Sequence, residues 1–406
     1  MEKRLGKWGK QGKWGKSGKR KKNLFPPFPP FTLFSLLPLF LLFSCKPENR
    51  IEQNFTATPY KIEIPAYFPT ILNIPDDNPL TVEGVELGRY LFYDGRLRGY
   101  TGTNPDSLMS CANCHLQQHG FECGINHPKY INGKTMGVTG IATPHYMMPL
   151  CNLVFNNNGY FWNGMIYNEN PDANFRNLED IVRMGIIAPH EMNSTVERSV
   201  KAIASISLYP PMFKAAFGTE EVTAERIQKA IAQFMRTLVS SNSRFDKYIR
   251  KEIQLTDEEL QGYILFTTEE GADCFHCHGS DANVLMTTNL YYNNGLNSTF
   301  SDTRDRFAVT NKSADIGAYR APSLRNIAVT APYMHDGRFK TLDEVIDFYS
   351  EGLHFSPYVH PLMHKINDGG ARLTPNQKQK LKAFLNTLTD DEFLTNPKYA
   401  KPTSLP

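Results

Sequence analysis

The amino-acid sequence predicts an all-α protein with two domains and long connecting loops. Helix-start signals and apolar residues at helical spacing recur along its 406 residues, whereas the alternation typical of strands is scarce. The motif Cys-x-x-Cys-His occurs twice, at Cys111–His115 and at Cys274–His278, 163 positions apart. That separation indicates one motif in each domain, within a chain long enough for two.

Helix-capping patterns locate three helices in the C-terminal half. Thr256–Glu259 has the form of a capping box and predicts a helix that runs directly to the second motif. Thr341–Glu344 is another capping box, and it opens a helix that Gly352 ends. Thr374–Leu388 is the last predicted helix, with a proline at its first helical position. In the middle of the chain, five apolar residues share one helical face: Ile227, Ala230, Ile231, Phe234 and Leu238.

Segments rich in Asn, Gly and Pro separate the predicted helices, notably residues 126–143 and 291–315. We expect loops of this kind where a chain surrounds a large cofactor that replaces part of the apolar core. The domain boundary is expected between residues 240 and 256. This gives an N-terminal domain over residues 46–250 and a C-terminal domain over residues 251–406.

The two Cys-x-x-Cys-His motifs carry the chemistry. Each supplies two thiols that can add to the vinyl groups of a haem, and a histidine that can ligate its iron. Random placement of 7 Cys and 11 His would give only about 0.003 copies of the motif. A zinc site also uses Cys-x-x-Cys pairs, but it does not require a histidine directly after them. We therefore expect two covalent haem c groups, in two cytochrome-c-like haem domains, attached at Cys111, Cys114, His115, Cys274, Cys277 and His278.

The N-terminal residues 1–45 are typical of a lipoprotein signal. Met1–Lys22 holds ten Lys or Arg, and an uncharged apolar stretch, Phe31–Ser44, leads to Cys45. A single-pass anchor is the alternative, but the stretch is shorter than the ~20 residues that a spanning helix needs, and Pro38 interrupts it. We expect an exported protein at the periplasmic face or in the cell envelope, held at the membrane by a lipid on Cys45.

Removal of this segment reverses the net charge of the chain. Ten of the 44 basic residues and one of the 41 acidic residues leave with it, so that 34 basic and 40 acidic residues give a net charge of −6. The basic balance of the whole chain is therefore no argument for nucleic-acid binding. An acidic surface would suit a basic electron-donor protein. Two further cysteines, Cys123 and Cys151, could form a disulfide after export or stay as buried thiols.

Several longer segments accompany the motifs in a fixed order: 87–93, 110–115, 161–164, 178–179, 189–192, 234–238, 306–310, 321–326 and 330–337. With these segments the chain resembles the bacterial dihaem cytochrome c peroxidase family, including its MauG branch. The resemblance covers nearly all of the chain after the signal segment. It implies an enzyme that reduces hydrogen peroxide at the N-terminal haem, with electrons relayed from a small cytochrome c-type donor through the C-terminal haem.

The resemblance also implies roles for individual residues. Glu191 matches the residue over the peroxide-binding iron, where a carboxylate can move a proton between the two oxygens. Trp162 matches the tryptophan between the two haems, and His335 matches a supporting residue near the second. Two other functions stay open. One is a MauG-like oxidase of a protein partner, and the other is a dihaem electron carrier without peroxidase activity.

The sixth iron ligands distinguish branches of this family. The position of a histidine that ligates the resting first iron is occupied here by Val138, which implies an open distal side. For the second iron, the family ligand lies 14 residues after the match of His335, and this chain has Tyr349 there, as MauG does. Met363 is the competing ligand and would give a higher reduction potential than a phenolate.

The chain also departs from the family pattern. The Arg of a Phe-Trp-Asp-Gly-Arg segment is replaced by Met165, and a Gln beside the peroxide pocket is replaced by Ile181, which weakens the expectation of fast peroxide turnover. Tyr146 replaces an Asn that helps to hold a calcium ion between the haems, with backbone oxygens near Thr330 and Pro332. A calcium ion therefore stays an expectation weaker than in the family.

Overall fold

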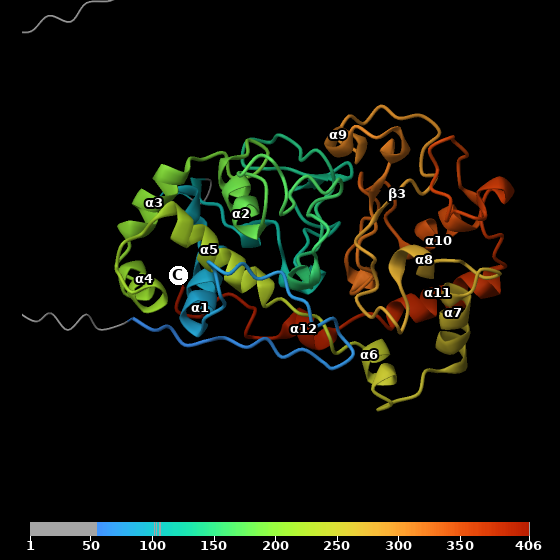
Figure 1. Ribbon diagram of the computed structural model, residues 1–406, viewed down its shortest axis with the longest axis horizontal. Coiled ribbons are helices and arrows are strands. Elements are labelled where there is room, and N and C mark those ends of the chain that lie inside the picture. The colour runs from blue at the N-terminus through green and yellow to red at the C-terminus, as the bar shows by residue number, and fades with distance from the viewer. Residues whose placement is uncertain (1–54, 101, 103, 105–106, 406) are drawn as a thin grey trace, which may run out of the picture. The chain divides into compact units, whose positions relative to one another are not determined.

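The computed structural model describes residues 55–100, 102, 104 and 107–405 (Figure 1). The predicted signal segment 1–45, including Cys45, lies outside the described residues. Within the described part of the chain, no helix is both long enough and apolar enough to cross a bilayer.

The structure is mainly helical, as the sequence predicts. Its α-helices are α1 Val82–Tyr93, α2 Leu178–Ile187, α3 Val196–Ala204, α4 Tyr209–Phe217, α5 Ala224–Arg236, α6 Arg244–Ile249, α7 Asp257–Thr267, α8 Phe275–His278, α9 Phe307–Thr310, α10 Leu342–Glu351, α11 Pro375–Asn386 and α12 Asp391–Thr395. The strands are β1 Tyr130–Ile131, β2 Lys134–Thr135, β3 Tyr291–Tyr292 and β4 Tyr319–Arg320. They form two short antiparallel pairs, β1 with β2 and β3 with β4. Both pairs begin inside the predicted loop segments, and the second of these segments also contains the short helix α9.

In the N-terminal half, α1 packs mainly against α5 (Figure 1). Gly88 of α1 lies so close to α5 that a Cβ atom there would be 1.9 Å from the backbone oxygen of Ala230. A residue without a side chain is therefore required at this crossing. The rings of Phe92 and Phe234 pack beside it with centroids 5.3 Å apart. The predicted apolar face is confirmed, because each of its five side chains is at most 1% exposed.

The C-terminal half repeats this arrangement with α7 and α11 (Figure 1). A Cβ atom on Gly262 would lie 1.9 Å from the backbone oxygen of Lys380. The rings of Phe266 and Phe384 pack at the crossing with centroids 5.1 Å apart. Each half therefore has one helix pair in which backbones touch at a glycine and aromatic rings fill the space alongside.

Both predicted capping boxes are present, and the last predicted helix also begins with one. Thr256, Thr341 and Thr374 each accept a hydrogen bond from the backbone amide three residues on, and the Glu or Gln side chain at that position accepts one from the threonine's backbone amide. One expectation is wrong, because the helix opened by Thr256 ends at Thr267 instead of running to the second motif. The chain folds back there, since the amide of Cys274 donates to the carbonyl oxygen of Phe266.

Two large apolar clusters form the interior. The first joins side chains between residues 87 and 238, and the second joins side chains between residues 245 and 388. Phe245 of α6 belongs to the second cluster, and Phe393 of α12 belongs to the first. The predicted division after residue 250 stays a prediction. The packing shows, however, that the C-terminal segment returns to the first cluster.

A buried arginine–carboxylate pair stabilises each half. The Arg236 guanidinium donates to both carboxylate oxygens of Glu179, at 2.6 and 2.9 Å. In the other half Arg325 donates to both oxygens of Asp246, at 2.8 and 2.7 Å. Paired donors of this kind satisfy charges that would otherwise be costly to bury. Because Glu179 is on α2 and Asp246 is on α6, the pairs fix helices to neighbouring loops and helices.

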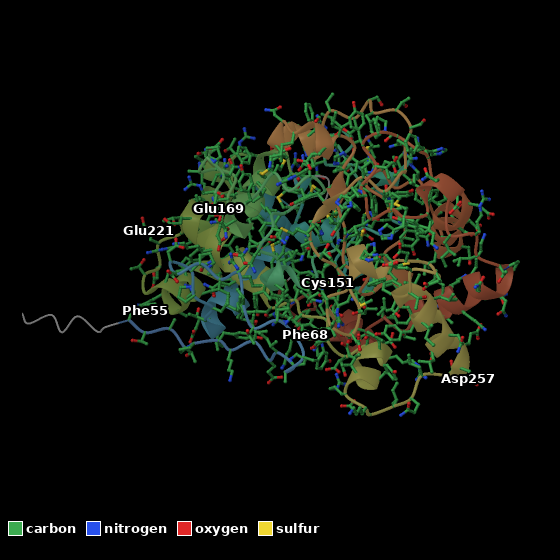
Figure 2. The ribbon with its side chains drawn as sticks, turned by 45° about the vertical axis from the view of Figure 1, so that its right-hand side comes forward. Phe55, Phe68, Cys151, Glu169, Glu221 and Asp257 are labelled. Atoms are coloured by element: carbon green, nitrogen blue, oxygen red, sulfur yellow. The ribbon has the colours of Figure 1, made fainter. Side chains whose placement is uncertain are left out.

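Within the described residues, the two cysteines outside the motifs, Cys123 and Cys151, are free thiols. Cys123 is fully buried and Cys151 is 5% exposed. Figure 2 labels Cys151, which packs in the first apolar cluster. Burial raises the pKa of each thiol to about 11. Of the two states left open by the sequence, the structure shows the buried-thiol state.

We predict that Gly262→Ala destabilises the protein. In a helix interior, alanine is normally more stabilising than glycine by up to ~1 kcal/mol. Here the added Cβ would push α7 away from α11, and overpacking of this kind costs about 1–3 kcal/mol. A lower midpoint of thermal unfolding, followed by circular dichroism, is expected. Gly102→Ala is the control, because a Cβ at Gly102 meets no atom within 4 Å. An unchanged or higher midpoint for Gly262→Ala would contradict the close crossing.

Candidate functional site

Each motif histidine is oriented by a backbone carbonyl. Nδ1 of His115 lies 2.7 Å from the carbonyl oxygen of Phe121, and Nδ1 of His278 lies 3.1 Å from that of Pro322. These bonds place the proton on Nδ1 and leave Nε2 as the ligating nitrogen. Burial lowers the pKa of both imidazoles to about 4, so both are neutral at pH 7. A neutral imidazole with a free Nε2 is the form that binds iron.

The four motif thiols fit covalent attachment of haem. Cys111, Cys114, Cys274 and Cys277 are all free and stand within three residues of the next member of their motif. Burial raises the pKa of each thiol above its usual value. Their sulfur atoms are the ones that would bond the vinyl carbons of a haem. Their apolar surroundings suit the flat face of a macrocycle.

A large cavity lies around the second motif, and we call it the second cavity. Its lining includes Cys274, Cys277 and His278, and it is mostly apolar. The empty volume around this lining is about 1640 Å³, a figure that includes space open to solvent. The cavity therefore has the apolar lining and the histidine nitrogen that a haem needs.

Glu191 lies across from the first motif. Helix α2 ends before it, and its carboxylate lies over Gly185, where a Cβ atom would be 3.0 Å from Oε2. Beside burial, the charge of Glu191 also raises the thiol pKa values of Cys111 and Cys114. Although 37% of its side chain is accessible, desolvation raises the pKa of Glu191 to about 7. A carboxylate with that pKa can both accept and return a proton at neutral pH.

The segment that carries Val138 packs onto the turn that carries Glu191. The amide of Val138 donates to the carbonyl oxygen of Glu191 at 2.9 Å, and the hydroxyl of Thr139 donates to that of Pro189 at 2.7 Å. A Cβ atom on Gly137 would meet the backbone of His190 at 2.3 Å. Val138 thus adds an apolar side chain next to the first cluster, where it cannot ligate a metal.

Trp162 lies at the wall of the second cavity and is 9% exposed. Its Nε1 donates to the carbonyl oxygen of Tyr146 at 2.7 Å, and its own carbonyl accepts from the amide of Arg320 at 2.7 Å. Tyr160 and Ile166, two positions before it and four positions after it, belong to the first apolar cluster. The indole therefore stands between the first core and the cavity of the second motif.

Both candidate ligands for the second iron line the same cavity as His278. Tyr349 is on α10, and Met363 is on the loop after His360. Nδ2 of Asn294 donates to the Tyr349 oxygen at 2.8 Å. Burial raises the pKa of Tyr349, and this hydrogen bond acts in the opposite direction. Nothing in the local sequence marks Asn294, because it lies 55 positions before its partner, in an irregular loop.

His335 is part of a buried ring cluster near Trp162. Its ring stacks on Tyr319 with centroids 3.7 Å apart, and His145 packs edge-on to it at 5.4 Å. Asp302 accepts from His145 at 2.6 Å and from the Tyr319 hydroxyl at 2.7 Å. Burial lowers the pKa of His335 to about 4. Asp302 was not predicted, since nothing in its local sequence sets it apart from other loop residues.

Glu122 is a further residue that the sequence did not indicate. It is 3% exposed, and its Oε2 has no hydrogen-bond partner among the described residues. It lines the second cavity together with Tyr146, Thr330 and Pro332, and burial raises its pKa. An unpartnered buried carboxylate oxygen is costly unless something else satisfies it.

Met165 and Ile181, which depart from the family pattern, both pack against the first apolar cluster.

Comparisons with known proteins identify the family. Residues 82–254 match the family model for di-haem cytochrome c peroxidase. The methylamine utilization protein MauG of Methylorubrum extorquens is 31% identical over 77% of this chain and 80% of its own length. Cytochrome c551 peroxidase of Nitrosomonas europaea is 31% identical over 77% of this chain and 82% of its own.

Solved structures give the same result. A MauG-like protein associated with microbial copper homeostasis superposes with a TM-score of 0.70 and 33% identity, over 84% of this chain and 99% of that one. The diheme peroxidase BthA of Burkholderia thailandensis, at 20% identity, shares the fold with a TM-score of 0.60, over 80% of this chain and 91% of its own. With relatives at 31% identity over three quarters of its length, the chain belongs to the di-haem cytochrome c peroxidase family.

Proposed function

We propose that the chain is a dihaem c-type peroxidase. It reduces hydrogen peroxide to water at the N-terminal haem, with electrons from a cytochrome c-type donor that pass through the C-terminal haem. Relatives of this chain carry the name cytochrome c peroxidase, among them that of Escherichia coli at 30% identity. The observation that carries the proposal is the carboxylate of Glu191, which faces the first motif with a pKa of about 7.

Glu191 supplies the proton transfer in this proposal. The haem groups supply the redox chemistry when they are bound. At pH values above its pKa, the Glu191 carboxylate takes a proton from peroxide, and it returns that proton to the departing oxygen. Its backbone is fixed by the hydrogen bond from Val138. The valine leaves this side of the site open to a small substrate.

Trp162 supplies an aromatic step between the two motifs. Its indole Nε1 donates to the carbonyl oxygen of Tyr146, and its backbone carbonyl accepts from the amide of Arg320. A fixed orientation lowers the rearrangement that accompanies electron transfer, so a rigid tryptophan suits a relay. The electron donor would approach the C-terminal half, where the second cavity opens to solvent.

The chain is also proposed to be exported and lipid-anchored at Cys45. This rests on the basic segment and the apolar stretch before Cys45. Covalent haem attachment, which takes place outside the cytoplasm, agrees with export. The acidic balance that remains after removal of residues 1–45 suits a basic donor protein.

A MauG-like oxidase is the second candidate function. The specific observation in its favour is the hydrogen bond from Asn294 to Tyr349, which stabilises a phenolate and so a tyrosine ligand. Such a ligand would lower the reduction potential of the second iron relative to methionine. A lower potential would make the second iron harder for a cytochrome c-type donor to reduce, which counts against delivery from such a donor. The relative with MauG in its name and the MauG-like solved structure agree with this candidate.

Glu122 could replace the missing asparagine in a calcium site. Tyr146 offers a phenol where the family has an amide, which makes the expected site poorer in oxygen ligands. Glu122, whose Oε2 has no partner among the described residues, lines the cavity that Thr330 and Pro332 also line. A carboxylate is a preferred calcium ligand, and a bound cation would remove the cost of burying it.

Cys277→Ala is expected to leave one haem on the chain. A pyridine haemochrome assay should give two haems per wild-type chain and one per variant, with the N-terminal haem retained. Turnover with an external donor should collapse, because the relay is lost. Cys123→Ala is the matched control, since Cys123 is a buried thiol outside both motifs, and it should keep two haems. One haem per wild-type chain would contradict the cofactor assignment.

Tyr349→Phe is expected to change the low-spin signal and the visible spectrum of the C-terminal haem. The variant keeps the ring but removes the oxygen that Asn294 contacts. Electron paramagnetic resonance and visible absorption are the measurements. Tyr358→Phe, a tyrosine in the same half with only partial burial, is the control. A change with Met363→Leu and none with Tyr349→Phe would assign the ligand to Met363.

Glu191→Gln is expected to slow the peroxide step by about 10²–10⁴-fold while both haems load normally. Because burial raises the pKa of Glu191 to about 7, the carboxylate form increases with pH through that value. The wild-type rate should therefore rise with pH and level off above about 7, and the variant should lack this inflection. Stopped-flow mixing with peroxide measures both.

The control for this experiment is Glu169→Gln. Glu169 is an exposed carboxylate in the same half, labelled in Figure 2. Its variant should react like the wild type at every pH. If wild type reacts readily and Glu191→Gln has the same rate and pH profile, Glu191 has only a structural role.

A further inference from the structure

Three metal-ligating side chains meet beside the second motif: Asp273, His276 and His364. Nδ1 of His276 is 2.7 Å from Oδ1 of Asp273, and Nδ1 of His364 is 3.2 Å from Oδ2. One donor atom from each residue can be chosen so that all three lie within 4.8 Å of one another. The residues come from the turn after α7, from between the motif cysteines, and from a loop 88 positions further on. The fold, and not local sequence, brings them together.

The carboxylate is positioned by the protein interior, while the imidazoles are nearer to solvent. The Asp273 side chain is 6% exposed, that of His276 is 20% exposed, and that of His364 is 41% exposed. The ion pairs that Asp273 makes within the described residues are with these two histidines. The two rings lie edge to face, with centroids 5.2 Å apart and an interplanar angle of 82°. A small ion can therefore reach the cluster from one side, and a fixed carboxylate faces that side.

The donor set selects a particular class of ion. Two imidazole nitrogens and one carboxylate oxygen are the ligands of many zinc sites, at about 2.0–2.2 Å from the metal. Donors around such an ion lie roughly 3.3 Å apart, so a rotation of the exposed His364 ring closes the arrangement. The fourth position is left for water. Imidazole favours Cu²⁺ and Zn²⁺ over Mg²⁺ and Ca²⁺, which prefer oxygen ligands.

We propose that Asp273, His276 and His364 bind one divalent transition-metal ion, Cu²⁺ or Zn²⁺. The proposal goes beyond peroxidase activity, because binding requires neither peroxide nor an electron donor. His276 stands between Cys274 and Cys277, so the ion adds positive charge at the edge of the C-terminal haem. Positive charge favours the reduced state of a neighbouring redox centre. Occupation of the site would therefore raise the reduction potential of that haem.

Titration of the haem-loaded full chain with Zn²⁺, followed by calorimetry, tests the site. We expect one equivalent to bind, and we expect His364→Ala to weaken that binding by at least about tenfold. His354→Ala, an exposed histidine in the same half, is the matched control and should bind like wild type. Cu²⁺ should show hyperfine coupling to two nitrogens by electron paramagnetic resonance. Mg²⁺ at the same concentration should not bind.

His276→Ala is a second variant, and its haem content is measured first because His276 lies inside the attachment motif. If that variant does not mature, His364→Ala still decides, since His364 is outside the motif. Redox titration adds an independent readout: Zn²⁺ should raise the potential of the C-terminal haem in wild type and not in His364→Ala. Equal Zn²⁺ affinity in wild type and His364→Ala would overturn the proposal. Loss of peroxide turnover with Zn²⁺ binding intact would refute the peroxidase function alone.

Discussion

The contact of two helix backbones at a glycine determines the geometry of each half. Gly88 on α1 and Gly262 on α7 each face a backbone oxygen of a later helix, and the two backbones are too close for a Cβ atom to fit between them. The glycine-bearing helix leads to the attachment motif, and the partner helix closes the apolar cluster behind it. The crossing therefore sets where the two thiols and the histidine stand relative to the rest of that half. Aromatic pairs such as Phe92 with Phe234 fill the remaining space and make the crossing rigid.

The carbonyl group that orients each motif histidine lies at a different distance along the chain. His115 is held by the carbonyl of Phe121, six residues on, and His278 by that of Pro322, 44 residues on. The first bond forms within one loop. The second requires that the segment around Pro322 has already packed against the motif. Two identical motifs thus depend on different parts of the fold, although both leave the same nitrogen free for iron.

Sequence reasoning succeeds where the determinant is local. The two predicted capping boxes, the start of the last helix and the apolar face of α5 each depend on residues a few positions apart, and all are present in the structure. It fails at the end of α7, because the turn depends on a contact between Cys274 and Phe266 across that end. It also misses Asn294 and Glu122, whose importance comes only from the partner, or the missing partner, that tertiary packing gives them.

The surroundings of the two motifs explain how one architecture can serve two roles. The first motif faces the Glu191 carboxylate, and burial holds its pKa at about 7, where proton exchange is easiest at neutral pH. The second motif faces Tyr349 and Met363, which can ligate a metal but are poor proton carriers at that pH. In the proposed function, acid–base chemistry belongs to the N-terminal half and ligand control of potential to the C-terminal half. Trp162 lines the second cavity and its indole is anchored to the carbonyl oxygen of Tyr146, so the same proposal makes it the aromatic step between the two environments.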